Sequence, residues 1–179
     1  MVGSTTDAVA AGAGFPVTLV RPAPPPGPIL LAVDAGHDQA DTGALFAFAF
    51  EEAALRGLPL RALYAAPGPT LRSYPLSTSH HGSRPQVRRA ARQLTEALLP
   101  WRDKYPGVRV EEVCHDDVPA QAVIAAARHA SLAILGRHAP HAARPRLGVV
   151  AHAAAHHAAC PIVLVPVPDA VTSRPRLAP

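Results

Sequence analysis

The chain has 179 residues, of which 49% are hydrophobic and only 4% aromatic, so we expect one domain with a core of alanine, valine and leucine. The formal charge of +4 comes from scattered arginines rather than a basic run interleaved with aromatics, which argues against nucleic-acid binding. No stretch reaches the roughly 18 apolar residues of a membrane span, and the first residues lack a secretory pattern. We therefore expect a soluble, cytoplasmic protein with no membrane partner.

Composition changes sharply along the first part of the chain. Residues 1–14 are rich in glycine, alanine, serine and threonine and are expected to be disordered, as are residues 169–179. The stretch 15–20 (FPVTLV) is a short β-prone run, and the prolines of 21–28 predict a stiff, extended linker. Residues 29–168 then carry the pattern of a folded domain.

Within that domain, short apolar runs alternate with longer amphipathic segments. The predicted strands are 29–33, 59–65, 108–113, 132–135 and 162–165. The predicted helices are one that ends near Arg56 after a cap at Asp38 or Asp41, and then 86–104, 119–129 (capped by Asp117) and 147–158. The alternation predicts a doubly wound α/β fold around a five-stranded parallel sheet.

The stretch 131–165 organises the chain. Its first strand is predicted to stop at Gly136, followed by a basic loop, a helix and the last strand. Because this loop leaves the carboxyl end of a strand and enters the amino terminus of a helix, it lies where open α/β sheets bind anions and nucleotides.

Four stretches of the domain resemble the universal stress protein family. They are ILLAVDAG (29–36), EEAALRGLPLRALYA (51–65), DDVPAQAVIAAARHASLAILG (116–136) and HHAACPIVLVP (156–166). The resemblance covers roughly residues 28–168 and implies a sheet of order 3-2-1-4-5, with the domain's strands numbered along the chain, as in adenine nucleotide alpha-hydrolase-like folds. It also implies an adenine-nucleotide site, with Asp34 near the adenosine.

The family's nucleotide-binding members carry G-x2-G-x9-G-[S/T] after the fourth strand, and this chain departs from it. Gly136 matches the first glycine, but Ala139 occupies the second position, eight residues separate it from Gly148, and Val149 replaces the hydroxyl residue. Two prolines in the loop also remove amide donors. The departures predict a regulatory or binding module in which ATP binding is weak or lost. The alternative is an ATP- or AMP-binding stress protein with slow hydrolysis, in which the loop's basic residues replace the motif.

The candidate nucleotide contacts come from the turn after the first strand, the loop and the next helix start. They are Asp34, Ala35, Gly36, Gly136, Arg137, His138, Arg146, Gly148 and Val149. Asp34 fits a helix or turn cap equally well. No catalytic set emerges, so a binding role is favoured over an enzyme.

Histidines offer a third interpretation, a metal-binding or pH-responsive protein. His152 and His156 have the i,i+4 spacing of a helical metal pair, but no acidic residue lies near them in the sequence. Surface histidines are the favoured interpretation, and no metal site is predicted.

One feature lies outside the domain. FPVTLVRP (15–22) is similar to CPIVLVPV (160–167), as if it were the tail of a preceding repeat of a tandem family member. Since the fifth strands of family dimers commonly pair antiparallel, we predict that 15–20 adds antiparallel to a fifth-strand edge, either its own or a partner's in a homodimer. The long stretch 66–84 is the predicted loop for a protein partner.

Overall fold

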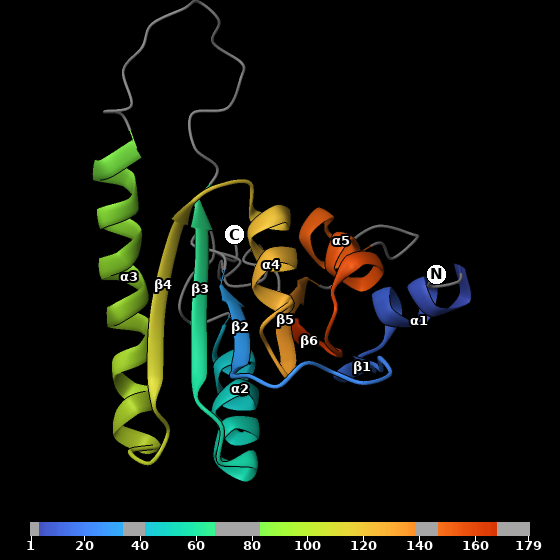
Figure 1. Ribbon diagram of the computed structural model, residues 1–179, viewed down its shortest axis with the longest axis horizontal. Helices are drawn as coiled ribbons and strands as arrows, with labels where there is room; N and C mark the ends of the chain where they lie inside the picture. The colour runs from blue at the N-terminus through green and yellow to red at the C-terminus, as the bar shows by residue number, and fades with distance from the viewer. Residues whose placement is uncertain (1–3, 34–41, 67–82, 139–146, 168–179) are drawn as a thin grey trace, which may run out of the picture.

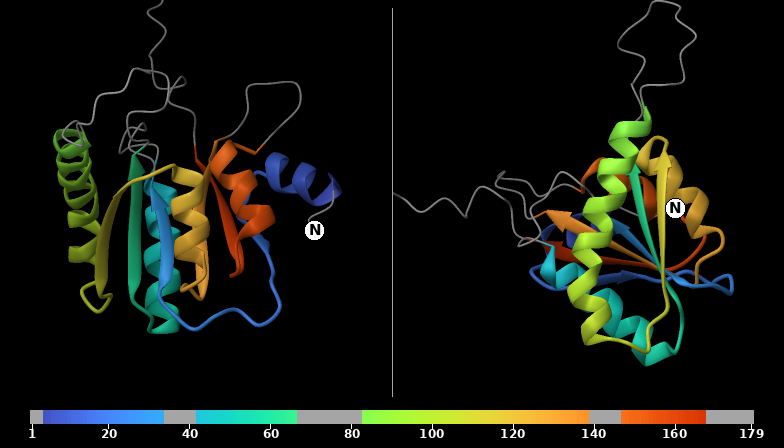
Figure 2. Two further views of the ribbon diagram at one scale, coloured as in Figure 1. Left: turned by 45° about the horizontal axis from the view of Figure 1, so that its top comes forward. Right: turned by 90° about the vertical axis from the view of Figure 1, so that its left-hand side faces the viewer.

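The computed structural model describes residues 4–33, 42–66, 83–138 and 147–167, which form a sheet with helices on both faces (Figures 1 and 2). The helices are α1 (Ser4–Gly12), α2 (Gly43–Arg56), α3 (Ser83–Lys104), α4 (Pro119–Ala127) and α5 (Val149–His157). The strands are β1 (Val17–Leu19), β2 (Ile29–Val33), β3 (Leu60–Ala66), β4 (Val110–Asp116), β5 (Leu132–His138) and β6 (Ile162–Val167). Among the helices of the described residues, none has the length and hydropathy needed to cross a bilayer.

The sheet has the order β1-β6-β5-β2-β3-β4, in which β2 to β6 run parallel. This confirms the predicted five-stranded order. It also confirms the predicted sixth, antiparallel strand, because β1 pairs with the β6 edge of its own chain, Val17 facing Leu164 and Leu19 facing Ile162. A covered edge presents fewer free backbone groups to other chains.

Two apolar layers hold the helices on the sheet. On one face, Phe46 and Phe50 of α2 and Leu98 of α3 are almost fully buried against the strands. On the other face, alanines of α1, α4 and α5 form a second apolar cluster with side chains of the strands, in which α4 contacts β2 and β3 and α5 contacts β5 and β6. The alanines let these helices lie close to the sheet, as the composition predicted for a core with few aromatics.

The N-terminal segment differs from its prediction. Residues 1–14 were expected to be disordered, yet Ser4–Gly12 form α1, which lies beside α5 (Figure 1), and Ala10 and Ala11 of α1 are buried. A helix of nine residues is marginal in isolation, so its stability comes from docking onto the rest of the chain. The predicted disorder of 169–179 concerns residues outside the described part of the structure.

The linker between β1 and β2 passes very close to the end of α4. Gly27 has φ of 157°, and a Cβ atom built there would lie far inside van der Waals contact of the carbonyl oxygen of His129. The backbone N–H of Ser131 donates to the carbonyl of Pro28 at 3.0 Å. Glycine at position 27 therefore allows the linker to bring β2 alongside β5.

Several element ends differ from the sequence prediction. The prediction that a strand stops at Gly136 is wrong, because β5 continues through Arg137 to His138. The reason is tertiary: β6 also continues to Val167 and supplies partners for this extension. Pro166 lies beyond the part of β6 that β1 pairs, where a missing N–H is tolerated.

The helix starts also depend on residues other than those predicted. At α4 the N-cap is Val118, whose backbone N–H donates to Oδ1 of Asp117 at 2.7 Å. At α2 the N-cap is Thr42, while Asp38 and Asp41 lie outside the described residues. The predicted end of α2 is confirmed, since Gly57 adopts the left-handed conformation with φ of 62°.

Candidate functional site

Five of the nine predicted nucleotide contacts lie in the described part of the structure, at the end of β5 and the start of α5. Of the nine, Asp34, Ala35, Gly36 and Arg146 lie outside the described residues. Gly136, Arg137 and His138 form the last part of β5, and Gly148 and Val149 form the start of α5. The loop predicted over 66–84 also falls mostly outside the described residues.

The start of α5 contains the last two positions of the predicted nucleotide motif, Gly148 and Val149. Gly148 is extended, with φ of −61° and ψ of 159°, and no side chain of the described residues caps the helix. In helix geometry the first amides have no intrahelical acceptor, so they can bind an anion. The adjacent Val149 side chain is 82% exposed and apolar, at the position where the family motif has a hydroxyl.

Gly136 lies within the sheet instead of opening the loop. A Cβ atom built there would lie 3.4 Å from Cδ2 of Leu45 and 3.5 Å from Cγ1 of Val167, which is ordinary packing against apolar side chains. β5 therefore continues to His138, two residues beyond the glycine at which the strand was predicted to stop.

Arg137 makes contacts that the sequence did not predict. Its side chain is 3% exposed, and its guanidinium donates to the carbonyls of Ala11, at 2.6 Å, and Ala13. These carbonyls lie at the end of α1, where a positive charge is favoured. Burial lowers the pKa of Arg137, but a guanidinium remains charged at neutral pH.

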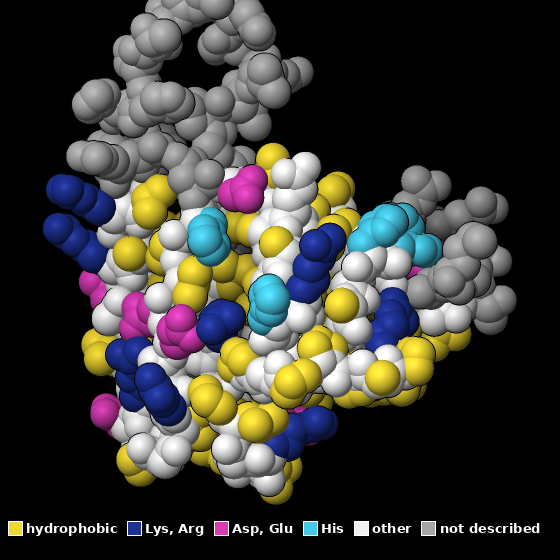
Figure 3. Space-filling view, in the orientation of Figure 1, with side chains coloured by type: hydrophobic (Ala, Val, Ile, Leu, Met, Phe, Trp, Pro, Cys, Tyr) yellow, Lys and Arg dark blue, Asp and Glu magenta, His cyan; other side chains and the backbone are white. Residues whose placement is uncertain are grey.

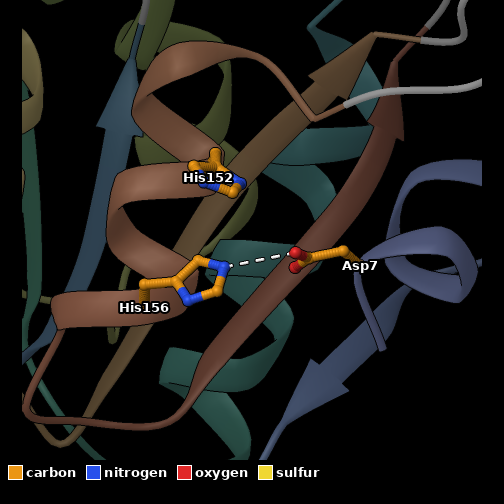
Figure 4. Close-up of side chains that lie close together, drawn as sticks. All are labelled: Asp7, His152 and His156. Atoms are coloured by element: carbon orange, nitrogen blue, oxygen red, sulfur yellow. Dashed lines mark hydrogen bonds and ion pairs between the residues drawn. The ribbon is translucent and has the colours of Figure 1, made fainter. Parts of the chain in front are cut away.

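A second set of contacts gathers at the other end of α5. Nε2 of His156 lies 3.2 Å from Oδ2 of Asp7, which belongs to α1 (Figure 4). The guanidinium of Arg21 donates to the carbonyl of Ala155. Asp7 is the acidic residue that was not apparent near His152 and His156 in the sequence, because it is 149 residues from His156. No local signal could have found it.

A pocket of about 400 Å³ lies elsewhere, between the end of α2 and the start of β4. Leu58, Tyr105 and Arg109 are among its lining residues. It lies at the amino ends of β3 and β4, whereas open α/β sheets bind nucleotides at the carboxyl ends. Among the predicted site residues that the structure describes, none lines it.

A mostly parallel sheet with the order β1-β6-β5-β2-β3-β4 and helices on both faces defines an open, doubly wound α/β protein. The universal stress protein family model matches residues 27–166, and the chain belongs to that family. This confirms the resemblance found in the sequence.

The curated relatives that this chain matches are also universal stress proteins. The chain is 28% identical over 177 residues to universal stress protein Rv1996 of Mycobacterium tuberculosis, covering 94% of this chain and 55% of the relative. It is 31% identical over 141 residues to universal stress protein Rv3134c of the same species, covering 78% and 48%. The chain thus spans about half the length of the curated relatives it matches.

Solved structures support the fold. The universal stress protein from Archaeoglobus fulgidus has a TM-score of 0.57 and 23% identity, covering 79% of this chain and 98% of its own. The structure of the universal stress protein from Archaeoglobus fulgidus in complex with dAMP has a TM-score of 0.54 and 25% identity, covering 79% and 97%.

Proposed function

We propose that this chain is a universal stress protein binding module with a degenerate nucleotide loop, in which ATP binding is weak or lost. The carrying observation is Val149. Where the family motif has a hydroxyl next to the phosphates, this chain has an exposed apolar side chain at the first turn of α5. A valine offers neither a donor nor an acceptor to a phosphate oxygen.

Arg137 supports the same proposal. The sequence offered it as a candidate nucleotide contact. Its guanidinium instead binds the carbonyls at the end of α1, so we leave it out of the proposed nucleotide contacts. The compensating charge would have to come from other basic residues of the predicted loop, which are His138, His141, Arg144 and Arg146.

A second candidate function is adenine-nucleotide binding, with slow hydrolysis as its enzymatic form. The Archaeoglobus fulgidus relative in complex with dAMP favours it, because a quarter of the aligned residues are identical. In this alternative Asp34, Ala35 and Gly36 hold the adenosine. The amides after Gly148 and the side chains of His138 and Arg146 hold the phosphates.

The decisive experiment identifies what the purified protein carries. Protein prepared without added nucleotide is denatured, and the released small molecules are identified by mass spectrometry and compared with the protein concentration. We expect less than about one nucleotide per ten chains, since the missing hydroxyl and amides weaken phosphate binding. Near-stoichiometric ATP or AMP would refute the degenerate site and establish the second candidate.

Family membership also underlies three broader proposals: a role in the stress response, a cytoplasmic location, and association of two copies or of a protein partner. Because β1 already pairs with β6, a second copy that used this edge would have to displace β1. Size-exclusion chromatography with light scattering measures whether the chain is a dimer, and hydrogen exchange measures whether β1 stays paired. A dimer in which β1 is still protected from exchange would place the interface elsewhere.

A further inference from the structure

We propose that Asp7, His152 and His156 form a zinc site that joins α1 to α5. The three side chains offer one carboxylate oxygen and two imidazole nitrogens, and their ligand atoms all lie within 4.8 Å of one another. Figure 4 shows Asp7 pointing from α1 toward the two rings on α5.

The helix supplies half of this geometry by its period. Positions 152 and 156 are one turn apart, so both rings project from the same face of α5, with their centroids 4.5 Å apart. Tetrahedral zinc with ligand bonds of 2.0–2.1 Å needs donor atoms roughly 3.3 Å apart. Nε2 of His156 and Oδ2 of Asp7 are 3.2 Å apart already, and His152 is exposed and can rotate toward them.

The carboxylate of Asp7 has an unused acceptor. Its Oδ1 is buried and has no hydrogen-bond partner among the described residues, while Oδ2 faces His156. A buried carboxylate oxygen without a partner is costly. A divalent cation bound between the carboxylate and the two imidazoles would give the Asp7 carboxylate a positively charged partner. Because His152 is exposed, a cation can enter the site from solvent.

The charges and dipoles around the three side chains influence how well a cation binds there. His156 lies in the last turn of α5, where the helix carbonyls favour positive charge. The neighbouring basic side chains are Arg21, whose guanidinium donates to the carbonyl of Ala155, and the exposed His157, whose ring centroid is 6.3 Å from that of His156. Figure 3 shows histidine side chains gathered on the surface at this end of the molecule.

The donor set selects the class of metal. Two imidazoles and one carboxylate suit zinc and similar transition metals, and three protein ligands leave a fourth position open. Magnesium prefers several oxygens and should not compete. A bound zinc would link residue 7 to residues 152 and 156, and so fasten α1 beside the β6 edge that β1 covers.

The test uses the full chain without a histidine tag, treated with chelator and then titrated with zinc chloride by calorimetry. We expect one zinc per chain and no response to magnesium chloride. His152→Ala and Asp7→Asn should each weaken zinc binding by at least about tenfold, the effect typical of removing a ligand or its support. His157→Ala, the matched control on the same turn, should change it by less than about threefold.

His152→Ala is the decisive variant, because the exposed side chain can be removed without opening the core. Its circular dichroism should match that of the unaltered chain. Zinc should also slow hydrogen exchange of α1 in the unaltered chain and in His157→Ala, but not in His152→Ala. Absence of zinc binding, or equal affinity in His152→Ala and His157→Ala, would overturn the proposal.

Discussion

The two ends of α5 differ in the neighbours that the described structure gives them. The amino end has no side-chain cap and an exposed Val149. At the carboxyl end, His156 lies beside Asp7 (Figure 4), and the carbonyl of Ala155 accepts a hydrogen bond from Arg21. Both partners come from the first 21 residues of the chain. In a family whose motif lies before the amino end of this helix, the polar contacts described here concentrate at the opposite end.

This contrast teaches that the N-terminal segment belongs to the folded domain. Arg137, at the end of β5, and Arg21, after β1, each donate hydrogen bonds to backbone carbonyls at the carboxyl end of a helix. Together with the pairing of β1 and β6, they connect α1, α5 and the sheet edge into one unit. The following predictions test how different the two ends of α5 are, beginning with the largest effect.

Replacing Arg137 with methionine should have the largest effect. The variant leaves the carbonyls of Ala11 and Ala13 without their charged donor, so the free energy of unfolding should fall by about 3 kcal/mol. Urea unfolding followed by circular dichroism measures it. Arg128→Met, at an exposed position at the end of α4, is the control and should change stability by less than about 0.5 kcal/mol. A loss below about 1 kcal/mol for Arg137→Met would show that α1 docks without the guanidinium.

Gly27→Ala should disturb the path that carries the N-terminal segment to the sheet. The added methyl group meets the backbone of His129, which cannot move away as a side chain could, so we expect a loss of about 2 kcal/mol. Gly107→Ala is the matched control, because a Cβ atom there meets nothing within 4 Å. Equal stability of the two variants in thermal unfolding would mean that the linker is free to move.

Cys160 reports how well the carboxyl end of α5 is covered. The residue is fully buried, and burial raises the pKa of its thiol, so little thiolate is present at pH 8. In Cys114→Ala, where only this thiol remains, reaction with a disulfide reagent should be at least about tenfold slower in the native state than in urea. Because the reactive form is the thiolate, raising the pH should speed the native reaction. Equal reaction rates of the Cys160 thiol in the native and unfolded states would show that this thiol is accessible to the reagent in the folded protein.

Val149→Ser tests the amino end and should have the smallest effect. A hydroxyl at this exposed position should change stability by no more than about 0.5 kcal/mol. It should raise ATP affinity by only about three- to fivefold, because one hydrogen bond returns while Ala139 and the short spacing remain. Val149→Ala, which removes bulk without adding a donor, is the control for calorimetry with ATP. A hundredfold gain would mean that the hydroxyl alone had been missing.

Much of the fold could be predicted from local sequence. The apolar runs at 29–33 and 162–165 and the helix stop at Gly57 depend on side chains next to one another in the chain. The antiparallel pairing of β1 was also predictable, because its sequence is similar to that of the strand it pairs with. The sheet order followed from the family resemblance and from the chain rules for parallel strands.

The candidate site was less accessible to such reasoning. The departures from the motif at Ala139 and Val149 are visible in the sequence, and they carry the proposal of a degenerate loop. The role of Arg137 was not visible, because a basic residue after a glycine looks the same whether it faces a phosphate or a helix end. Its hydrogen-bond partner Ala11 is 126 residues away.

The sequence by itself therefore determined most of the strands, the helices of the domain, the family and the departures of the loop from the family motif. Only the tertiary structure decided that residues 4–12 form a helix, that Arg137 donates hydrogen bonds to the carboxyl end of α1, and that Asp7 lies beside His156. The physical reason is that a short alanine-rich helix has too little intrinsic stability to be recognised locally. Its contacts join residues more than 120 positions apart, and only the folded sheet brings them together.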